Sequence, residues 1–568
     1  MRIEGKRYRD EWLPNFYPSR ELAPDRWLRI SRTGKTVVLS AAEDRQISEI
    51  YMDAPLYERL ERTGHILTPA NATRVFQELK LWQLRYYAGP ELHIVVTTAR
   101  CNLACTYCHM NPQPLESSAD EFDMSPETAR AVVEFAMSSP NSRVCFEFQG
   151  GEPFLNFAAI RAVVEHAEAI NRAAGKELVF SAVTNLMVAR DEHLAFCRDH
   201  DIRVSYTVNG PEAIHDYYRR TGKGTGSFAG VMRRLRQVQE RFPDILSATP
   251  LCVIDDYSAP RLKEMIDFYF DEGFNGVGLI RLKPLGFARK GELKFGITRF
   301  MEAYLGGLEY ILDKNKTSGR AFQEYMVPVV LAKILGESDT GFVDWRNPCG
   351  DISGAIIYDY DGEILPVDEA RSMRDVFALG NVRSVTYEEL MRGKDTFRTM
   401  NLSLRDRDAT CRECAYNPYC GANPVLEYAR TGSLEPRPQN PTIAYIRCHC
   451  WIGHLKSCWK ILSRSCSWFP RWANIWVNCS SGPQHRRRRG CYSNSWITGS
   501  SGLPAPDLSC GLDHRYGKSD RQIVSSALAT SVTEISFIVA ALTCRWRTKR
   551  KPNSDGSDGP NNPTPGIP

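Results

Sequence analysis

Three cysteines stand within eight residues of one another, in the stretch CNLACTYCHM that contains Cys101, Cys105 and Cys108. Their C-x3-C-x2-C spacing places three thiols on one short loop, and thiolates are the protein ligands of iron–sulfur clusters. A cluster of four irons held by three thiolates keeps one iron open, and a metal site needs an open position to bind a reacting molecule. The alternative is a zinc site with a fourth ligand from elsewhere, for which His109 is the nearest candidate.

A second motif, GGEP, directly follows a predicted strand and consists of Gly150, Gly151, Glu152 and Pro153. Two successive glycines let a backbone turn approach a ligand closely, because neither carries a side chain. Glu152 offers a carboxylate that can accept a hydrogen bond from an amino group. Alone the motif is typical of a simple turn, but one β/α unit after three clustered cysteines it indicates a binding site.

Both motifs need a framework, and the sequence from residue 92 onward alternates β-rich runs with amphipathic helices. Helix starts are indicated at Ser125 and Asn156, and a long helix is expected over 227–242. Six β/α units in succession predict a parallel sheet, either open and doubly wound or curved into an incomplete barrel, with the active site at the carboxyl ends of the strands. The strands are predicted at 92–98, 143–149, 178–184, 202–208, 246–254 and 277–282.

With its C-x3-C-x2-C loop followed by GGEP, the sequence resembles the radical S-adenosylmethionine (SAM) enzymes. The resemblance implies a partial (β/α)6 barrel and a 4Fe-4S cluster on Cys101, Cys105 and Cys108, whose open iron binds the amino and carboxylate groups of SAM. It further implies that one electron cleaves SAM to methionine and a 5′-deoxyadenosyl radical, which takes a hydrogen atom from the substrate. In such chemistry the protein supplies positioning, tuning of the cofactor and exclusion of side reactions.

The resemblance extends to residues beyond the two motifs. The segment TVNGPEAIHDYYRR (207–220) is similar to the family's S-x-D-G-P-x-x-I-H-D segment, with Thr207 at the serine position and Asn209 in place of the usual aspartate. Arg233 is a candidate for contact with the SAM carboxylate, and its alternative is an arginine on a solvated helix face. The other positions implied to contact SAM are Tyr107, near the adenine, and Gln149, Thr184 and Asn185.

A further region, about 340–438, resembles the SPASM extension of peptide-modifying members, which carries two auxiliary 4Fe-4S clusters. Cys411, Cys414 and Cys420 keep the C-x2-C-x5-C part of its pattern. Two other ligand positions hold Val367 and Pro424, which implies that one auxiliary cluster is lost and one remains. The alternative is a zinc site on the three thiols.

Other positions of the SPASM pattern are only partly kept. Cys349 and Gly362 hold their places, but Cys349 without its partners is also compatible with a simple buried thiol. The remaining auxiliary cluster lacks a clear fourth ligand, for which Cys448 and Cys450 are candidates. Asp368 occupies the position at which sulfatase-maturating relatives carry a carboxylate proposed as a general base, and its alternative role is to stabilise a turn.

Longer stretches such as YDYDGEILPVDEAR and CAYNPYCGANPVLEYARTGSLEPRP resemble, more narrowly, the radical SAM maturase of the His-Xaa-Ser repeat peptide system. That resemblance covers about residues 20–438. It implies as partners a small peptide or protein substrate and an electron donor, either a reductase or a flavodoxin- or ferredoxin-type protein. The alternatives are a sulfatase-type maturase and a non-catalytic protein that binds zinc or an iron–sulfur cluster.

The length of 568 residues predicts several domains. We expect a small N-terminal α+β module (1–90), with a strand pair around residues 32–34 and peptide docking as its candidate role, then a radical SAM core (91–320) and the SPASM-like region (340–438). A tail follows (439–568) that holds seven of the eleven tryptophans and eight of the eighteen cysteines. Because intrinsic disorder avoids both residue types, we interpret the tail as out-of-frame or foreign sequence, and the alternative is a genuine irregular extension.

Charge and composition weigh against several classes of partner. The net charge of +5 is concentrated in the last quarter of the chain and gives no case for nucleic acid. The N-terminus lacks the apolar segment of a signal peptide, and the longest late apolar run, 535–542, is far below the roughly 20 residues that cross a bilayer. We therefore expect a cytoplasmic protein without a membrane partner. Cys145, Cys197 and Cys252 stand singly in predicted strands or helices and are expected to be core residues.

Overall fold

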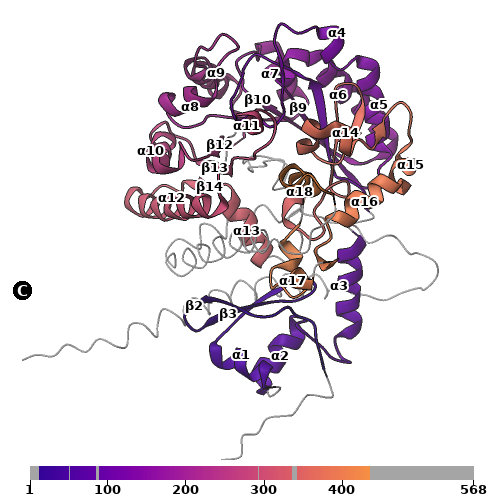
Figure 1. Cartoon of the computed structure of the whole chain (residues 1–568), viewed down its shortest axis with the longest axis vertical. Coiled ribbons are helices and arrows are strands. Elements are labelled where there is room, and N and C mark those ends of the chain that lie inside the picture. The colour runs from indigo at the N-terminus through magenta and orange to yellow at the C-terminus, as the bar shows by residue number, and fades with distance from the viewer. Residues whose placement is uncertain are drawn as a thin grey trace, which may run out of the picture. The chain divides into compact units, whose positions relative to one another are not determined.

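The computed structural model describes residues 12–434, apart from 50–51, 85–87, 248, 292, 294, 336–341, 408 and 422 (Figure 1). The tail predicted at 439–568, with Cys448 and Cys450, lies outside the described residues. Within the described residues no helix is both long enough and apolar enough to cross a lipid bilayer.

Six parallel strands form the centre of the fold, and each lies beside the next one along the chain. Four of them pair directly, β6 with β9, β9 with β10 and β10 with β11, and β12 pairs with β13. Two isolated parallel bridges, Val204 to Leu246 and Thr207 to Leu251, join these two groups. The strands are β6 (Leu92–Thr98), β9 (Arg143–Gly150), β10 (Glu177–Thr184), β11 (Ile202–Tyr206), β12 (Leu251–Ile254) and β13 (Gly276–Arg281).

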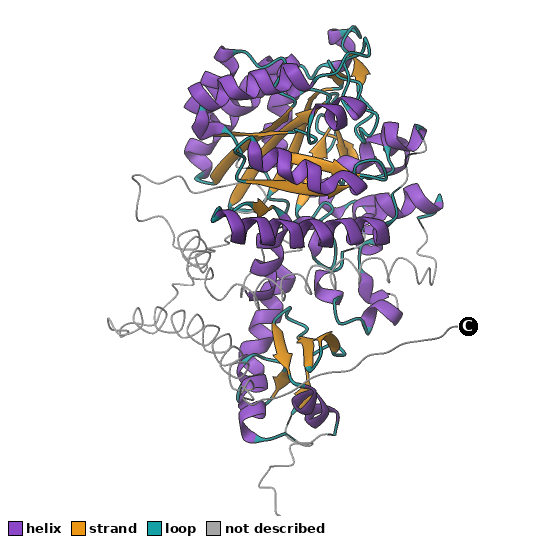
Figure 2. Ribbon diagram, turned by 90° about the vertical axis from the view of Figure 1, so that its left-hand side faces the viewer, coloured by secondary structure: helices purple, strands orange, loops and turns teal. Residues whose placement is uncertain are grey.

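The composition of these strands explains their position. Every residue of β6 is buried, as expected for a parallel strand covered on both faces. Figure 2 shows the helices gathered around the core strands. The predicted helix starts are confirmed, because the side chains of Ser125 and Asn156 accept hydrogen bonds from backbone N–H groups in the first turns that follow. The helices between the strands are α5 (Pro126–Met137), α6 (Phe157–Ala174), α7 (Asp191–Asp199), α8 (Glu212–Tyr218), α9 (Phe228–Arg241) and α10 (Leu262–Asp271).

A hairpin from the later part of the chain extends this sheet. Strand β15 (Ala355–Tyr358) pairs in parallel with β6, and β16 (Glu363–Leu365) and β17 (Gly380–Asn381) follow in antiparallel order. The stretch IIYDYDGEILPV, residues 356–367, predicts two strands joined by a turn, and this pair is confirmed, whereas its union with the core sheet was not predicted. The core is therefore an α/β fold with a mixed sheet, seven strands in the order β11-β10-β9-β6-β15-β16-β17.

The N-terminal residues form small sheets of their own. The predicted strand pair is confirmed as β3 (Arg26–Ile30) and β4 (Thr36–Leu39), to which β2 (Arg20–Ala23) adds a third antiparallel strand. Strands β1 (Leu13–Pro14) and β5 (Ile66–Leu67) form a second small sheet. The helices α1 (Ala41–Ser48), α2 (Ala54–Arg62) and α3 (Ala72–Leu84) accompany them. Two contacts reach the later cysteine segment: Tyr17 donates to the side chain of Asn417 at 3.2 Å, and Tyr419 donates to the carbonyl of Gly34.

The remaining elements lie in two places, between β6 and α5 and after β13. Short strands β7 (Arg100–Cys101) and β8 (Gln113–Pro114) and helix α4 (Ala119–Phe122) lie between β6 and α5. After β13 come α11 (Gly286–Lys290), α12 (Ile297–Ser318), β14 (Gln323–Glu324) and α13 (Met326–Leu335). The last helices are α14 (Arg374–Phe377), α15 (Tyr387–Arg392), α16 (Lys394–Leu402), α17 (Ala409–Arg412) and α18 (Pro424–Thr431).

His93 connects the β15–β16 hairpin to the core sheet and makes the stability of the fold sensitive to acid. Its ring is buried in β6, with Nδ1 2.8 Å from the hydroxyl of Tyr358 on β15 and Nε2 3.2 Å from the carbonyl of Pro90. Burial lowers the pKa of His93 to about 3, although the hydrogen bond to Pro90 opposes the shift. In the unfolded chain this histidine binds a proton below about pH 6.5, whereas the fold keeps it neutral until the pH approaches 3. The stabilisation by neutral His93 is therefore complete above pH 6.5 and is lost as the pH falls toward 3.

We therefore expect the free energy of unfolding of the parent to fall more steeply with acid than that of His93→Gln. The difference in slope is about 1.4 kcal/mol per pH unit below pH 6, the value for one proton. Urea unfolding of both proteins at pH 7, 5.5 and 4.5 measures it. Equal slopes in the two proteins would show that His93 is not held neutral by the fold.

Candidate functional site

The three cysteines predicted to bind a cluster lie together on the loop that follows β6. Cys101 and Cys105 are buried and Cys108 is half-buried. Burial is the main cause that raises the pKa of each thiol, and for Cys108 it reaches about 11. The pKa of Cys101 is raised further by the negative charges of Glu152, Cys105 and Cys108, which shows that the loop and the GGEP motif share one environment. Such thiols become good ligands only when a positive charge offsets their ionisation.

The GGEP turn rests directly on the backbone that leads into Cys101. The N–H of Gly151 donates to the carbonyl of Thr98, and the N–H of Glu152 donates to the carbonyl of Arg100, both at 2.9 Å. A Cβ on Gly150 would lie 2.3 Å from the carbonyl oxygen of Thr98, and one on Gly151 would lie 2.1 Å from that of Arg100. Both glycines are thus required by close backbone packing against the cysteine loop.

Gly151→Ala is expected to destabilise the protein by about 3 kcal/mol, because its new methyl group meets a carbonyl oxygen that cannot move without shifting Cys101. Gly306→Ala is the matched control. Gly306 lies in α12, where a Cβ would meet no atom within 4 Å beyond the helix's own backbone, so that variant is expected to gain about 0.5–1 kcal/mol. Urea unfolding of both variants provides the measurement, and a Gly151→Ala protein as stable as the parent would contradict the packing described.

Glu152 is hydrogen-bonded to two other residues that are predicted to contact the cofactor. Its buried carboxylate accepts hydrogen bonds from the hydroxyl of Thr184 at 2.6 Å and from the N–H of Asn185 at 2.8 Å. The side chain of Asn185 in turn donates to Asn102 on the cysteine loop at 2.8 Å. Burial raises the pKa of Glu152 to about 6, opposed by these hydrogen bonds. Pro153 is buried and begins the short turn η1 (Pro153–Asn156). The structure therefore brings the GGEP motif, Thr184 and Asn185 to one place.

Tyr107 is buried beside a residue that sequence reasoning missed. Its hydroxyl accepts a hydrogen bond from Nη1 of Arg219 at 3.0 Å, and its ring lies 5.3 Å from that of Tyr218. Burial opposes the charge of Arg219, but the negative charges of Cys105, Tyr107 and Cys101 raise its pKa. The Nε of Arg219 is buried without a hydrogen-bond partner among the described residues. A buried cation thus faces the three thiols with one donor still available to a ligand.

Arg219 is held in place by residues 218–221, a segment that we call the strap, which pairs with the cysteine loop. After α8 ends at Tyr218, the chain runs antiparallel to the loop, with a bridge between Thr221 and Leu103. The carbonyl of Tyr218 accepts from the N–H of Thr106 at 3.0 Å, and the carbonyl of Arg220 accepts from the N–H of Ala104 at 2.7 Å. Arg219 lies inside the segment 207–220 that resembles the family, but only the strap reveals its closeness to the cysteines.

The donor set fits an iron–sulfur cluster. Three thiols come from one loop, and a buried guanidinium supplies the charge that thiolate ligands require. Within the described part of the chain no group of three His, Cys, Asp or Glu side chains is arranged to hold a single metal ion. In a cluster each thiolate binds its own iron, so the sulfurs do not have to meet at one point.

The other predicted SAM-contacting residues are distributed differently. Gln149, at the end of β9, donates to the carboxylate of Glu147 at 2.7 Å. Thr207 lies just beyond β11, in the bridge to Leu251. Asn209 is buried and its side-chain oxygen accepts from the N–H of Val253 at 2.8 Å, so the amide that replaces the usual aspartate connects two strand ends. Gln149 lies at the carboxyl end of a core strand, as predicted, and Thr207 and Asn209 lie just beyond the end of β11.

Arg233 does not join this group. It is exposed on α9 and lines a surface hollow of about 380 Å³ together with Arg190 and Arg234. None of the residues that line this hollow belongs to the cysteine loop. The arrangement is that of the alternative role, an arginine on a solvated helix face.

Asp368 lies beside the third cysteine. It accepts a hydrogen bond from Nε2 of His109 at 3.1 Å, which leaves His109 paired with a carboxylate. Lys283, at the end of β13, contacts Glu369 at 2.5 Å. Burial by itself would raise the pKa of Asp368, but the hydrogen bond from His109 and the charge of Lys283 hold it below its usual range. Burial and the charge of Asp368 raise the pKa of Glu369 above its usual range.

The chain that follows β13 also supports the cysteine loop. The N–H of Phe287 donates to the carbonyl of Cys108 at 2.8 Å. Gly286 has a φ of 52°, and a Cβ there would lie 2.6 Å from the carbonyl oxygens of Cys108 and His109. No local sequence pattern marks Lys283 or Glu369, or the residues that contact the backbone of Cys108. For that reason none of these features was predicted.

The later cysteines lie in a series of turns. The N–H of Cys414 donates to the carbonyl of Cys411 at 3.0 Å, and the side chain of Asn417 donates to the same carbonyl at 2.9 Å. The N–H of Cys420 donates to the carbonyl of Asn417 at 3.2 Å. These hydrogen bonds fold the C-x2-C-x5-C segment into successive turns in which Asn417 is a shared partner.

The positions of the second auxiliary site are filled by apolar packing. Val367 is buried in an aliphatic cluster that includes Val343 and Val425, and Pro424 is buried at the start of α18. Cys349 is buried next to Gly421, where a Cβ would lie 2.8 Å from its own, and donates to the carboxylate of Asp351 at 3.4 Å. The core positions predicted for Cys145, Cys197 and Cys252 are confirmed, because all three are buried.

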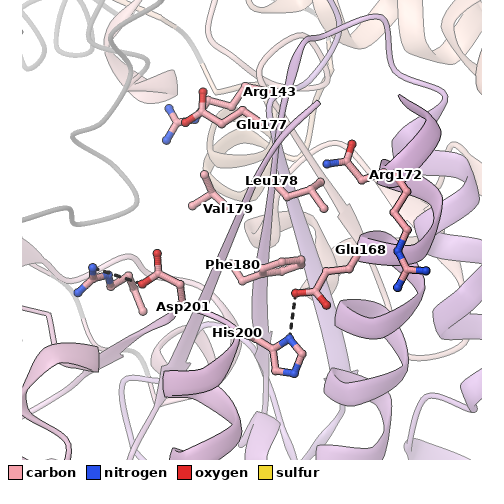
Figure 3. Close-up of a pocket in the computed structure, with 11 residues that line it drawn as sticks. Arg143, Glu168, Arg172, Glu177, Leu178, Val179, Phe180, His200 and Asp201 are labelled. Atoms are coloured by element: carbon pink, nitrogen blue, oxygen red, sulfur yellow. Dashed lines mark hydrogen bonds and ion pairs between the residues drawn. The ribbon is translucent and has the colours of Figure 1, made fainter. Parts of the chain in front are cut away.

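A pocket of about 550 Å³ lies at the opposite end of the core strands (Figure 3). It is lined by Arg143, Glu177 and Asp201, each at or next to the amino end of a strand, and by His200, which contacts Glu168 at 2.9 Å. Because ligands of parallel α/β sheets bind at the carboxyl ends of strands, we do not assign the site to this pocket.

Comparison with known proteins agrees with the geometry. The sequence profile of the Radical SAM superfamily matches residues 95–269. A cysteine-type anaerobic sulfatase-maturating enzyme of Clostridium perfringens is 22% identical over 341 residues, which cover 58% of this chain and 88% of that enzyme. A serine-type anaerobic sulfatase-maturating enzyme of Bacteroides thetaiotaomicron is 23% identical over 358 residues, which cover 60% of this chain and 83% of that enzyme.

A solved structure shows the same fold. Native anSMEcpe with bound AdoMet and the Kp18Cys peptide aligns with a TM-score of 0.52 at 20% identity, over 68% of this chain and 99% of that chain. The likeness extends beyond the six core strands to most of the described chain. At this identity it establishes the fold.

Proposed function

We propose that this chain, a radical SAM enzyme related to the peptide-modifying maturases, removes a hydrogen atom from a small peptide or protein by means of SAM and a 4Fe-4S cluster. The observation that carries the proposal is that three features lie together at the carboxyl ends of parallel strands. They are the three-cysteine loop, the buried cation Arg219, and Glu152 with its hydrogen-bonded partners. In this proposal the six core strands act as a partial (β/α)6 barrel.

The residues of the chain have distinct parts in this proposal. Cys101, Cys105 and Cys108 would hold the cluster, which with SAM supplies one-electron cleavage of a sulfonium bond and a carbon radical. Arg219 offsets the charge of the thiolates from a buried position. Glu152 fixes the ends of β9 and β10 through its hydrogen bonds, and its carboxylate would accept a hydrogen bond from the amino group of SAM. Cys411, Cys414 and Cys420 would hold one auxiliary 4Fe-4S cluster.

The proposed substrate is a small protein with His-Xaa-Ser repeats. Support comes from the longer stretches that resemble the maturase of that system and from a related fold whose solved structure contains a peptide. The N-terminal module is the candidate for docking this substrate, and deletion of residues 1–85 should then raise the KM for the peptide. The chemistry calls for a low-potential electron carrier and a reducing compartment, in keeping with the expected cytoplasm.

Product analysis tests this function. The chain, reconstituted anaerobically, is incubated with SAM, dithionite and a His-Xaa-Ser peptide deuterated at its carbon positions. We expect deuterium in 5′-deoxyadenosine and a mass change in the peptide. Abundant 5′-deoxyadenosine without deuterium transfer would exclude this peptide while leaving the cleavage of SAM intact.

A sulfatase-type maturase is the second candidate, favoured by the hydrogen bond between His109 and Asp368 beside the third cysteine. If Asp368 is a general base there, Asp368→Asn should lower modification of a sulfatase-derived peptide by about 100-fold, whereas cleavage of SAM without peptide stays unchanged. If the His-Xaa-Ser peptide is the substrate and Asp368 only stabilises its turn, modification should stay within about threefold of the parent. Asp361→Asn, in the turn of the same hairpin, is the control.

A further inference from the structure

The core strands have one fully buried face and one partly exposed face. Along β11 and β12 buried residues alternate with partly exposed ones, which include Ser205 and Val253. The buried residue Cys252, next to Val253, interacts with the hydroxyl of Tyr269 on α10. The buried face is therefore the one that the helices cover, and the partly exposed face is turned away from them. We call this second face the inner face of the sheet.

Glu147 lies on the inner face of β9. It is in register with Ser181 on β10, which is in register with the partly exposed Arg203 on β11, and neighbours in register share a face. The carboxylate of Glu147 accepts hydrogen bonds from the side chains of Gln149 at 2.7 Å and Ser181 at 3.3 Å. Arg203 instead donates to the carbonyl of Asp244, near the amino ends of the strands. Because Gln149 directly precedes the GGEP motif, the carboxylate of Glu147 lies just below the GGEP turn.

The side chain of Tyr325 also lies on the inner face. Glu324 on β14 accepts a hydrogen bond from Tyr304 on α12 at 2.6 Å, so the next residue, Tyr325, points away from that helix. Tyr325 continues the ladder beside β13, and its Cβ would lie 3.4 Å from a Cβ on Gly278. Only 8% of Tyr325 is exposed, yet its hydroxyl has no hydrogen-bond partner among the described residues. A buried hydroxyl without a partner is costly, which points to a missing ligand.

Tyr325 and Glu147 share one environment. Burial is the main cause that raises the pKa of Tyr325, and the negative charge of Glu147 is the largest further cause. The charges of Glu324 and Asp344 act in the same direction. The hydroxyl of Tyr325 therefore keeps its proton and can donate a hydrogen bond. The inner face thus offers a ligand one hydroxyl donor and one carboxylate acceptor.

We propose that Glu147 and Tyr325 bind the imidazole ring of a histidine in the peptide substrate, an inference that rests on the proposed function. A neutral imidazole has one ring N–H that donates and one ring nitrogen that accepts. The N–H would donate to the carboxylate of Glu147, and the other nitrogen would accept from the hydroxyl of Tyr325. A His-Xaa-Ser repeat supplies such a ring. In this arrangement the two residues determine which side chain enters the site and take no part in the cleavage of SAM.

Calorimetric binding of a synthetic peptide with two His-Ala-Ser repeats to the reconstituted chain tests the proposal. Tyr325→Phe removes only the hydroxyl, and we expect its Kd for this peptide to be about fivefold weaker than that of the parent, the effect of one hydrogen bond. Glu147→Gln should weaken binding about tenfold, because the lost hydrogen bond is to a charged group. For a peptide with alanine in place of both histidines, each variant should bind as the parent does.

The stability of the free protein separates binding from a structural role. Tyr325→Phe removes a buried hydroxyl that has no partner, so its free energy of unfolding in urea should equal or exceed that of the parent. Tyr206→Phe is the matched control. Tyr206 is 2% exposed and alternates with Ser205 on β11, so its ring lies on the opposite face and its variant should bind both peptides as the parent does.

The formation of 5′-deoxyadenosine separates this inference from the function it rests on. With SAM and dithionite but no peptide, Tyr325→Phe should form as much of it as the parent. Equal binding of the histidine and alanine peptides by the parent, or unchanged binding of the histidine peptide by Tyr325→Phe, would overturn the histidine site even if SAM is cleaved. A peptide with asparagine at the histidine positions that binds equally well would assign the site to a side-chain amide and overturn the choice of imidazole. A parent that cleaves no SAM would instead overturn the proposed function, and peptide binding would still decide on the histidine site.

Discussion

Cys105→Ala is expected to abolish the binding of iron and sulfide at the first site and with it the cleavage of SAM. Cys105 is buried at the centre of the loop, and the charges of Cys101, Cys108 and Arg219 all interact with it. Without its sulfur a cluster would keep two protein ligands, and no other thiol of the described chain belongs to this loop. Iron, sulfide and zinc content after anaerobic reconstitution, together with 5′-deoxyadenosine formation, measure the loss.

Cys197→Ala is the matched control for this prediction. Cys197 is a fully buried core cysteine in α7, so its loss should cost about 1 kcal/mol of stability and leave the metal content unchanged. A Cys105→Ala protein that still cleaves SAM at the parent rate would show that the loop does not hold the reactive group.

Arg219→Met carries the second large expected effect. The variant keeps most of the volume of the side chain but removes the buried positive charge beside Cys101 and Cys105, together with the hydrogen bond to Tyr107. Groups that support metal ligands typically contribute 10- to 100-fold to metal affinity or activity, and we expect a loss of that size in cluster retention and SAM cleavage.

The control for Arg219→Met is Arg236→Met, an exposed arginine of α9 that pairs with Glu272. It should leave both quantities unchanged. The role assigned to Arg219 would be contradicted if its variant kept a full complement of iron and cleaved SAM at the parent rate. Thermal unfolding of each protein distinguishes a loss of the fold from a loss of the cluster.

Much of the core could be predicted because its strands are marked by composition. The run LHIVVTT predicted β6 with its observed bounds, since five of its seven residues are β-branched and such residues favour strands. The prediction over 246–254 was too long. Only Leu251–Ile254 pairs as a strand, because Pro250 just before it lacks an N–H for the ladder.

The site could be predicted only as far as its residues form local motifs. The cysteine loop, GGEP and the pair Thr184 and Asn185 come together because each follows a parallel strand, and such ends meet at one edge of the sheet. Arg219 was missed because its burial depends on the strap, and Lys283 because its partner Glu369 is far away in sequence. The pairing of β15 with β6 is equally non-local, since nothing in either strand specifies the other.

The most direct measurement is the formation of 5′-deoxyadenosine by the full chain after anaerobic reconstitution with iron and sulfide, upon addition of SAM and dithionite. We expect 5′-deoxyadenosine and methionine in equal amounts, with iron rather than zinc on the protein. Bound zinc and no cleavage of SAM would contradict the proposed function and identify the loop at Cys101, Cys105 and Cys108 as part of a non-catalytic metal site.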